Sequence, residues 1–231
     1  MTRTHTSAFA KYVPQAWPFQ YKGTMIVDTL CGGIPSDPNV AEGWIRGVMG
    51  ETSDARLQAQ VAEVMAQRGL PESEAIEEIN RRKHLNGFKR DEESGELYID
   101  GRQLKAAIKE AAMIAVASDK IVGRSWGRTN KGLKAFLAEH VGVVDDQLLT
   151  GRKEPDGVNQ RFVQTFRGTG IQYEEYLREV ELTFTVITDY EFDEQTWAMI
   201  WLTGQEQGIG ATRSQGYGRY TLTGWEQVAV G

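Results

Sequence analysis

The chain has 231 residues, of which 40% are hydrophobic and 25% are charged, with a net charge of −6. This is ordinary globular composition with room for a substantial core, and it excludes a disordered chain. One cysteine excludes an internal disulfide, the apolar runs are too short to cross a bilayer, and the polar first ten residues lack a secretion signal. We therefore expect a cytoplasmic protein that does not enter the membrane.

Charge is distributed unevenly along the chain. Residues 51–80 carry a net charge of −5, whereas residues 101–134 carry +6. Overall acidity argues against nucleic-acid binding by bulk positive charge. Counterion release depends on local phosphate contacts, however, so a basic stripe on an acidic protein can still bind a polyanion. A solvated helix face explains the same residues equally well.

Hydrophobic periodicity predicts six core elements. In chain order they are a strand at 21–30, a helix at 102–117, strands at 141–149 and 177–188, a helix at 193–205 and a strand at 217–225. Strand, helix, strand, strand, helix, strand is the ferredoxin-like (RRM-like) βαββαβ order. It predicts an α+β fold in which helices cover one face of an antiparallel sheet.

The remaining segments surround this core. Residues 1–18 lack periodicity and are expected to form a flexible arm before one domain over 19–231. A helix is predicted at 39–49, and amphipathic helices at 55–67 and 71–82 predict a helical insertion over about 51–90. A short strand is expected at 97–99. The segment 151–175 is expected to be a loop that connects to a neighbouring molecule, as is the arm.

The most informative segment runs from Gly208 to Tyr220 and holds four glycines between a helix and a strand. Glycine permits a positive φ and leaves no side chain between a ligand and the backbone, and exposed N–H groups in such a loop bind anions. Arginine forks suit phosphates and tyrosines stack on bases. The candidate nucleic-acid-binding residues of this loop are Gly208, Gly210, Arg213, Ser214, Gln215, Gly216, Tyr217, Gly218 and Arg219.

Other phosphate motifs fit this loop poorly. It contains no Gly-Lys-Ser/Thr, and it follows a helix and precedes a strand, the reverse of a Rossmann turn. A tight helix-to-strand connection with incidental arginines remains the alternative explanation of the glycines. The binding groove would extend along basic residues and one tryptophan of the positive segment, namely Lys105, Lys109, Arg124, Trp126, Arg128 and Lys131.

The glycine-rich segment resembles the C-terminal loop of the RAMP superfamily, the ferredoxin-like RNA-binding proteins of CRISPR systems. Two further segments are similar in kind: Leu30 to Pro35, which resembles the glycine-containing loop after the first strand, and Ile99 to Ile108, which resembles the start of the helix facing the RNA. The overall acidity and the helical insertion depart from the family, and a virus-encoded relative is compatible with them. The resemblance implies polymerisation along a guide RNA for non-catalytic members and RNA cleavage for others.

Catalytic and metal-binding residues have little support in the sequence. His5, His84 and His140 lie far apart, and one cysteine cannot build a structural zinc site, so no metal and no cofactor are expected. His84 and His140 are candidates for acid–base RNA cleavage. The resemblance adds an aspartate after the first strand, at Asp37 or Asp28, although an ordinary turn or helix-cap role explains Asp37 better. Cys31 is expected to be a small buried hydrophobe.

The sequence therefore predicts a non-catalytic protein that binds single-stranded RNA, or single-stranded DNA, and forms a helical homo-oligomer along the strand. Two alternatives stay open. One is a RAMP-type endoribonuclease, and the other is a structural or assembly protein in which the glycine-rich loop only turns the chain.

Overall fold

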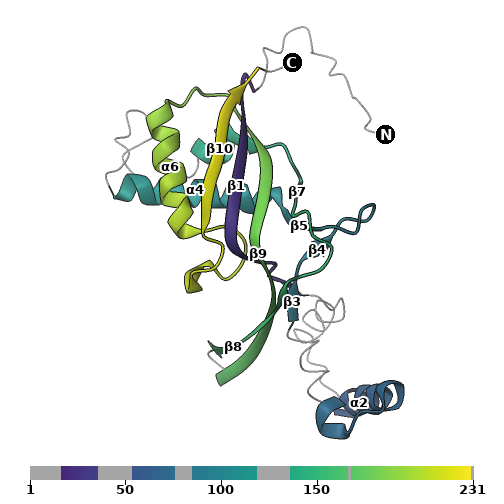
Figure 1. The fold of residues 1–231 in the computed structure, drawn as a ribbon. Coiled ribbons are helices and arrows are strands. Elements are labelled where there is room, and N and C mark those ends of the chain that lie inside the picture. Colours follow the sequence, from purple (N-terminus) through teal and green to yellow (C-terminus); the bar gives the residue numbers. More distant parts are fainter. Residues whose placement is uncertain (1–16, 36–53, 76–84, 119–135, 166–167, 230–231) are drawn as a thin grey trace.

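The computed structural model describes residues 17–35, 54–75, 85–118, 136–165 and 168–229 (Figure 1). The N-terminal arm up to residue 16 and the predicted helix at 39–49 lie outside these ranges.

Four antiparallel strands form the centre of a seven-stranded sheet (Figure 1). They are β1 (Phe19–Cys31), β6 (Val141–Val143), β9 (Gly168–Thr188) and β10 (Tyr220–Val228), and they lie side by side in the order β10-β1-β9-β6. Helix α4 (Gly101–Ala117) connects β1 to β6 along the chain, and α6 (Glu194–Gln207) connects β9 to β10. This is the ferredoxin-like βαββαβ arrangement, so the predicted α+β fold class is confirmed.

Both helices cover the same face of this sheet (Figure 1). In β1, Met25 and Val27 are fully buried, whereas Ile26 and Asp28 between and beyond them are exposed. Such alternation places successive side chains on opposite faces of a strand, so one face packs on the core and the other remains open. In α4 the buried positions recur every three or four residues, as an amphipathic helix requires, and they are Gly101, Leu104, Ala107, Ile108, Ala111, Ala112 and Ala115.

Strand β9 extends far beyond the part that pairs with β1. Its first half pairs with β8 (Gly157–Thr165), from Gly157 opposite Tyr176 to Thr165 opposite Gly168. The two strands form a hairpin that projects from the sheet (Figure 1). The expectation of a loop over 151–175 was therefore wrong. Glycine, asparagine, glutamine and arginine dilute the β-branched residues of this segment, which weakened the strand pattern.

Short strands complete the molecule. β2 (Ile34–Pro35) pairs with β3 (Leu85–Gly87), which runs parallel to β9. β4 (Lys89–Arg90), β5 (Leu97–Asp100) and β7 (Gln147–Leu149) form a second sheet. Helix α2 (Asp54–Arg68) contributes Val61 and Val64 to a small hydrophobic cluster with Ala75, separate from the main core. Among the described residues, no helix is long and apolar enough to span a membrane.

Candidate nucleic-acid interface

The glycine-rich loop is tied by its backbone to the end of β1. The N–H of Ala211 donates to the carbonyl oxygen of Cys31 (3.2 Å), and the N–H of Gly218 donates to that of Thr29 (2.7 Å). Ile209 N–H donates to Gly218 O (2.8 Å), which closes the loop on itself. The structure thus brings together the two glycine-containing segments that the sequence singled out. At Gly33 an added Cβ would lie only 2.2 Å from the Cβ of Ala211.

Two glycines of the loop have different surroundings. Both Gly216 and Gly218 have a positive φ, of 86° and 76°. A Cβ on Gly218 would lie 1.9 Å from the carbonyl oxygen of Ile209, whereas a Cβ on Gly216 would meet nothing within 4 Å. Gly218 is therefore required for the close packing of the loop. Gly216 is exposed and leaves the backbone open to a ligand.

Three successive amides on the outer part of the loop have no acceptor among the described residues. They belong to Thr212, Arg213 and Ser214, at the point where Thr212 takes a left-handed conformation (φ 62°) ahead of the short 3-10 turn η2 (Arg213–Gln215). Consecutive N–H groups in such a turn form a concave anion-binding arrangement. The backbone therefore offers donors that suit a phosphate.

The two arginines of the loop differ in their partners. Arg213 Nη1 donates to Glu110 Oε2 on α4 at 2.7 Å, and both side chains are partly exposed. The side chain of Arg219 is exposed and makes no ion pair within the part of the chain that the structure describes. Arg219 is thus available to a ligand, while Arg213 must share its guanidinium with a carboxylate.

Residues of the β8–β9 hairpin contact the loop, and the sequence analysis missed them. Asn159 Nδ2 donates to the hydroxyl of Tyr217, and Thr212 Oγ1 donates to Glu174 Oε2 at 2.5 Å. Asn159 and Glu174 lie directly opposite each other in the hairpin. Arg161 belongs to the same face, with its Nη2 3.2 Å from Glu174 Oε1. The alternating polar residues at 159, 161, 172 and 174 were the available signal for a polar strand face.

The basic residues of α4 are only partly available to a ligand. Lys105 Nζ donates to the carbonyl oxygen of Ala138 at 2.9 Å. Burial and the neighbouring Lys109 lower the pKa of Lys105 below its ordinary value. Lys109 is half-buried and has no hydrogen-bond partner in the described ranges. The predicted groove residues Arg124, Trp126, Arg128 and Lys131 lie outside the described residues.

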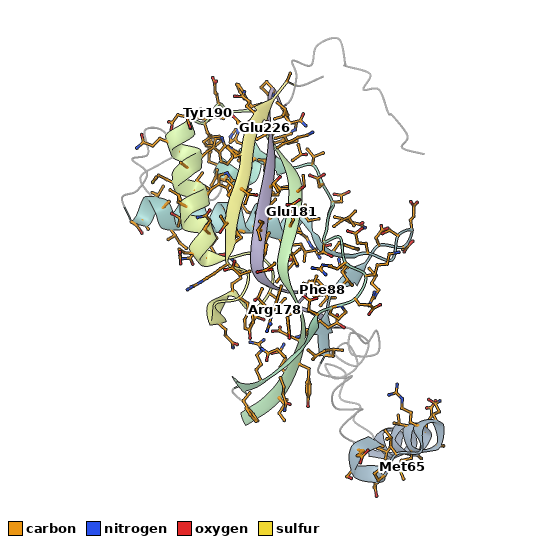
Figure 2. The ribbon with its side chains drawn as sticks, viewed as in Figure 1. Met65, Phe88, Arg178, Glu181, Tyr190 and Glu226 are labelled. Carbon is orange, nitrogen blue, oxygen red and sulfur yellow. The ribbon has the colours of Figure 1, made fainter. Side chains whose placement is uncertain are left out.

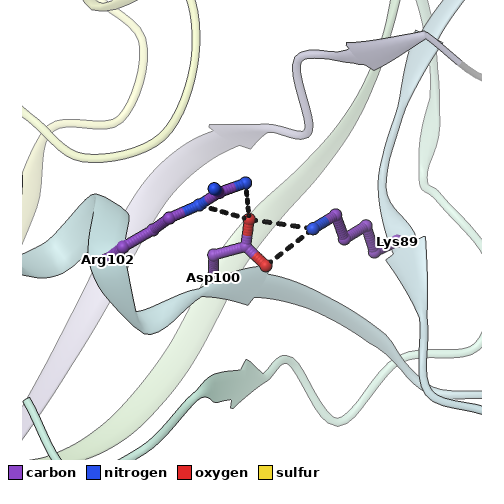
Figure 3. Close-up of polar contacts among 3 residues, drawn as sticks. All are labelled: Lys89, Asp100 and Arg102. Carbon is purple, nitrogen blue, oxygen red and sulfur yellow. Dashed lines mark hydrogen bonds and ion pairs between the residues drawn. The ribbon is translucent and has the colours of Figure 1, made fainter.

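The start of α4 is fixed by an ion cluster around the half-buried Asp100. Asp100 accepts two bonds from Lys89 Nζ, at 2.8 and 2.9 Å, and two from the Arg102 guanidinium, at 2.8 and 3.0 Å (Figure 3). Desolvation raises the pKa of Asp100, but these bonds outweigh it, so the pKa lies below its ordinary value. The segment that resembles the RNA-facing helix of the RAMP superfamily is therefore anchored structurally, and Arg102 shares its exposed guanidinium with a carboxylate.

The catalytic candidates are scattered. Asp37 and His84 lie outside the described residues, and Asp28 is exposed on the open face of the sheet. His140 Nδ1 lies 2.8 Å from Asp189 Oδ1, and Asp189 precedes Tyr190 at one end of the sheet (Figure 2). Arg178 lies toward the other end, where it pairs with Thr29 near the glycine-rich loop. The length of β1 separates the two ends by about 40 Å.

Cys31 is fully buried, as predicted for a small hydrophobe. Burial, and to a lesser degree the nearby Glu174, raises the pKa of its thiol to about 12. A protonated, enclosed thiol is a poor nucleophile. No group of metal-binding side chains occurs among the described residues.

Comparison with known proteins finds likeness in structure but not in sequence. No protein-family model matches the sequence, and no curated protein matches it. A chain in a cryo-EM structure of the Type III-B Cmr-beta bound to cognate target RNA is similar at 11% identity and a TM-score of 0.46. The match covers 91% of this chain and 61% of that chain, so this chain spans less than two thirds of its neighbour's length.

Proposed function

We propose that this chain is a non-catalytic protein that binds the backbone of single-stranded RNA at its glycine-rich loop. The observation that carries the proposal is the outer part of this loop, where the amides of Thr212, Arg213 and Ser214 have no acceptor among the described residues and the exposed Arg219 follows. Backbone amides and guanidinium groups are common donors to nucleic-acid phosphates, and they carry no sequence information. Binding should therefore depend strongly on salt and weakly on base sequence.

The glycine-rich loop and its neighbours supply a polar surface rather than a bulk positive charge. Tyr217, held at its hydroxyl by Asn159, offers a partly exposed ring on which a base can stack. Such stacking contributes about 1–3 kcal/mol per base. The net charge of −6 makes this local set of donors more important, because the rest of the surface repels a polyanion on average.

The choice of RNA, and the oligomer along the strand, rest on the resemblance of the loop to the RAMP superfamily. Backbone subunits of CRISPR effector complexes in that superfamily assemble side by side on a guide RNA. Single-stranded DNA offers the same phosphates and the same stacking faces. The binding experiment must therefore include both single-stranded RNA and single-stranded DNA.

The test begins with protein purified at low salt, whose absorbance ratio and particle mass are measured before and after nuclease digestion. Affinity for fluorescein-labelled oligouridine and oligothymidine is then measured by anisotropy across a range of salt concentrations. The double variant Arg213→Ala/Arg219→Ala should weaken binding to every sequence and flatten the salt slope by about 1.4, since each phosphate contact on a single strand contributes about 0.7.

A matched control removes two positive charges elsewhere. Arg152 and Lys153 are exposed in the turn ahead of β8, and their replacement by alanine changes the net charge equally. A slope that changes as much in this control as in the loop variant would refute the assignment to the loop. Protein that carries no nucleic acid and ignores both strands would favour the assembly protein. Strand cleavage that is lost in His140→Ala would favour the endoribonuclease.

A further inference from the structure

Glu174 is a carboxylate buried near the base of the β8–β9 hairpin. It is 3% exposed, and its two oxygens have different partners. Oε1 lies 3.2 Å from Arg161 Nη2, and Oε2 accepts the hydroxyl of Thr212 at 2.5 Å. Removing a carboxylate from water is costly unless it is paired and hydrogen-bonded, so these contacts explain how the hairpin tolerates it.

Arg161 is itself held in place on the same face of the hairpin. Its Nη2 donates to Gln172 Oε1 at 2.8 Å, and its side chain is largely buried. The guanidinium is thus fixed by one residue of β9 while it neutralises another. A carboxylate oriented in this way presents its second oxygen in one direction, toward the loop.

The hydrogen bond to Glu174 bears on the backbone conformation of Thr212. Its φ of 62° is a left-handed conformation that β-branched side chains rarely adopt. Such conformations persist only where the surrounding structure imposes them. The backbone ties of Ala211 and Gly218 hold the two sides of the loop, and the Gln215 N–H donates to the Thr212 carbonyl oxygen at 3.0 Å within it. The hydroxyl bond to Glu174 is the contact that ties Thr212 to the hairpin.

We infer that Glu174 is a positioning residue for the glycine-rich loop. Its carboxylate, oriented by Arg161, holds Thr212 in the left-handed conformation that directs the free loop amides toward the nucleic-acid backbone. The inference rests on the proposed function for the identity of the ligand. The hairpin and the loop then act as one unit, with Asn159 and Tyr217 as a second tether between them.

The experiment compares isosteric and conservative changes at Thr212. Thr212→Val keeps the shape but removes the hydroxyl, and Thr212→Ser keeps the hydroxyl. Thr183→Val is the matched control, because Thr183 is exposed on β9, about 30 Å along the strand from Glu174. All variants are first compared with the wild type by thermal unfolding.

Two readouts separate the inference from the proposed function. Cys31 is the sole cysteine, its carbonyl oxygen accepts the Ala211 amide, and its thiol lies beside Glu174 and Arg161. Iodoacetamide labelling of Cys31 at about pH 8 therefore reports how often the loop region opens in the free protein, whether or not nucleic acid binds. Anisotropy with labelled oligouridine reports binding.

Thr212→Val should label about tenfold to a hundredfold faster and lose a comparable factor in RNA affinity, because a hydrogen bond to a charged group is removed. Thr212→Ser and Thr183→Val should match the wild type in both readouts. Unchanged labelling in Thr212→Val would overturn the inference. Faster labelling with unchanged affinity would also overturn it, since the loop conformation would then have no part in binding.

Glu174→Gln keeps the experiment decisive if Thr212→Val does not fold. The amide retains an oxygen that accepts the Thr212 hydroxyl, but it loses the charge through which Arg161 orients this side chain. Its labelling rate should rise by a smaller factor than that of Thr212→Val. A wild-type rate would overturn the inference. A wild type that does not bind RNA would refute the proposed function and leave the labelling arm as the test of the loop contact.

Discussion

Replacing Glu110 by glutamine should strengthen RNA binding while it weakens the fold. Glu110 Oε2 lies 2.7 Å from Arg213 Nη1, so the carboxylate already accepts a hydrogen bond from the guanidinium that we propose to bind a phosphate. When a phosphate bonds to the other side of Arg213, the two negative charges lie about 6 Å apart across the guanidinium. Their repulsion at the dielectric constant of water is about 0.7 kcal/mol.

This energy predicts the size and the salt dependence of the effect. Glu110→Gln should bind oligouridine about threefold more tightly at low salt, since about 1.4 kcal/mol corresponds to a factor of ten. The gain should shrink as salt rises, because the Debye length falls to about 10 Å at 0.1 M. The free energy of unfolding should fall by less than about 1 kcal/mol, which is typical of partly exposed ion pairs.

Anisotropy titrations at several salt concentrations and urea denaturation measure the two effects. Glu226→Gln serves as the control, because Glu226 is exposed near the opposite end of β10 and its replacement changes the net charge equally (Figure 2). An affinity that falls in Glu110→Gln would show that the carboxylate orients Arg213 for binding. An affinity that rises equally in both variants would reduce the effect to net charge and refute the local repulsion.

Three further predictions concern stability. Gly216→Ala should lower the free energy of unfolding by about 1 kcal/mol, from the positive φ alone, whereas Gly218→Ala should cost more, because its Cβ would overlap the Ile209 carbonyl oxygen; urea denaturation of both variants tests this. Burial raises the pKa of the Cys31 thiol to about 12, so its contribution to the free energy of unfolding is fully present below about pH 9, where the unfolded thiol is protonated, and is lost as pH rises toward 12. The difference in the free energy of unfolding between wild type and Cys31→Ala should therefore shrink over that range. A constant difference would contradict this prediction. The lowered pKa of Asp100 acts in the opposite sense. Its contribution to the free energy of unfolding is present above the unfolded pKa of about 3.9 and is lost as pH falls through the folded pKa. The difference in the free energy of unfolding between wild type and Asp100→Asn should therefore narrow in acid.

Most core elements were predictable because their hydrophobic patterns are strong, although the strand predicted at 141–149 is divided into β6 and β7, which belong to different sheets. The strand predicted at 21–30 is β1 over 19–31, and the helix predicted at 193–205 is α6 over 194–207. Each carries apolar residues at the period of its own structure, and that period survives in any tertiary context. The β8–β9 hairpin was missed because the face that carries Arg161 and Glu174 is polar. These two side chains neutralise each other there, so the apolar alternation that indicates a strand is absent.

The site was only half predictable for the same reason. Glycines and arginines are visible in the sequence, but the partner that restrains each arginine is not. Arg213 and Arg219 look equivalent in the chain, whereas the fold places a carboxylate from α4 against the first and none of the described carboxylates against the second. Pairing across 103 residues is set by how α4 packs against α6, and no local pattern encodes it.

The contacts of the glycine-rich loop bear on how an acidic protein could bind a phosphate there, as we propose. Its two polar anchors, Glu110 and Glu174, are both acidic and lie on different elements, yet each is already engaged by an arginine and Glu174 also by Thr212. Their charges are therefore largely neutralised at close range and repel a phosphate less than free carboxylates would. Arg219 then adds an exposed guanidinium that makes no ion pair among the described residues. On this reasoning, the net charge of the chain is a poor guide to its ligand, and the local balance between anchored carboxylates and Arg219 decides whether a polyanion can approach the loop.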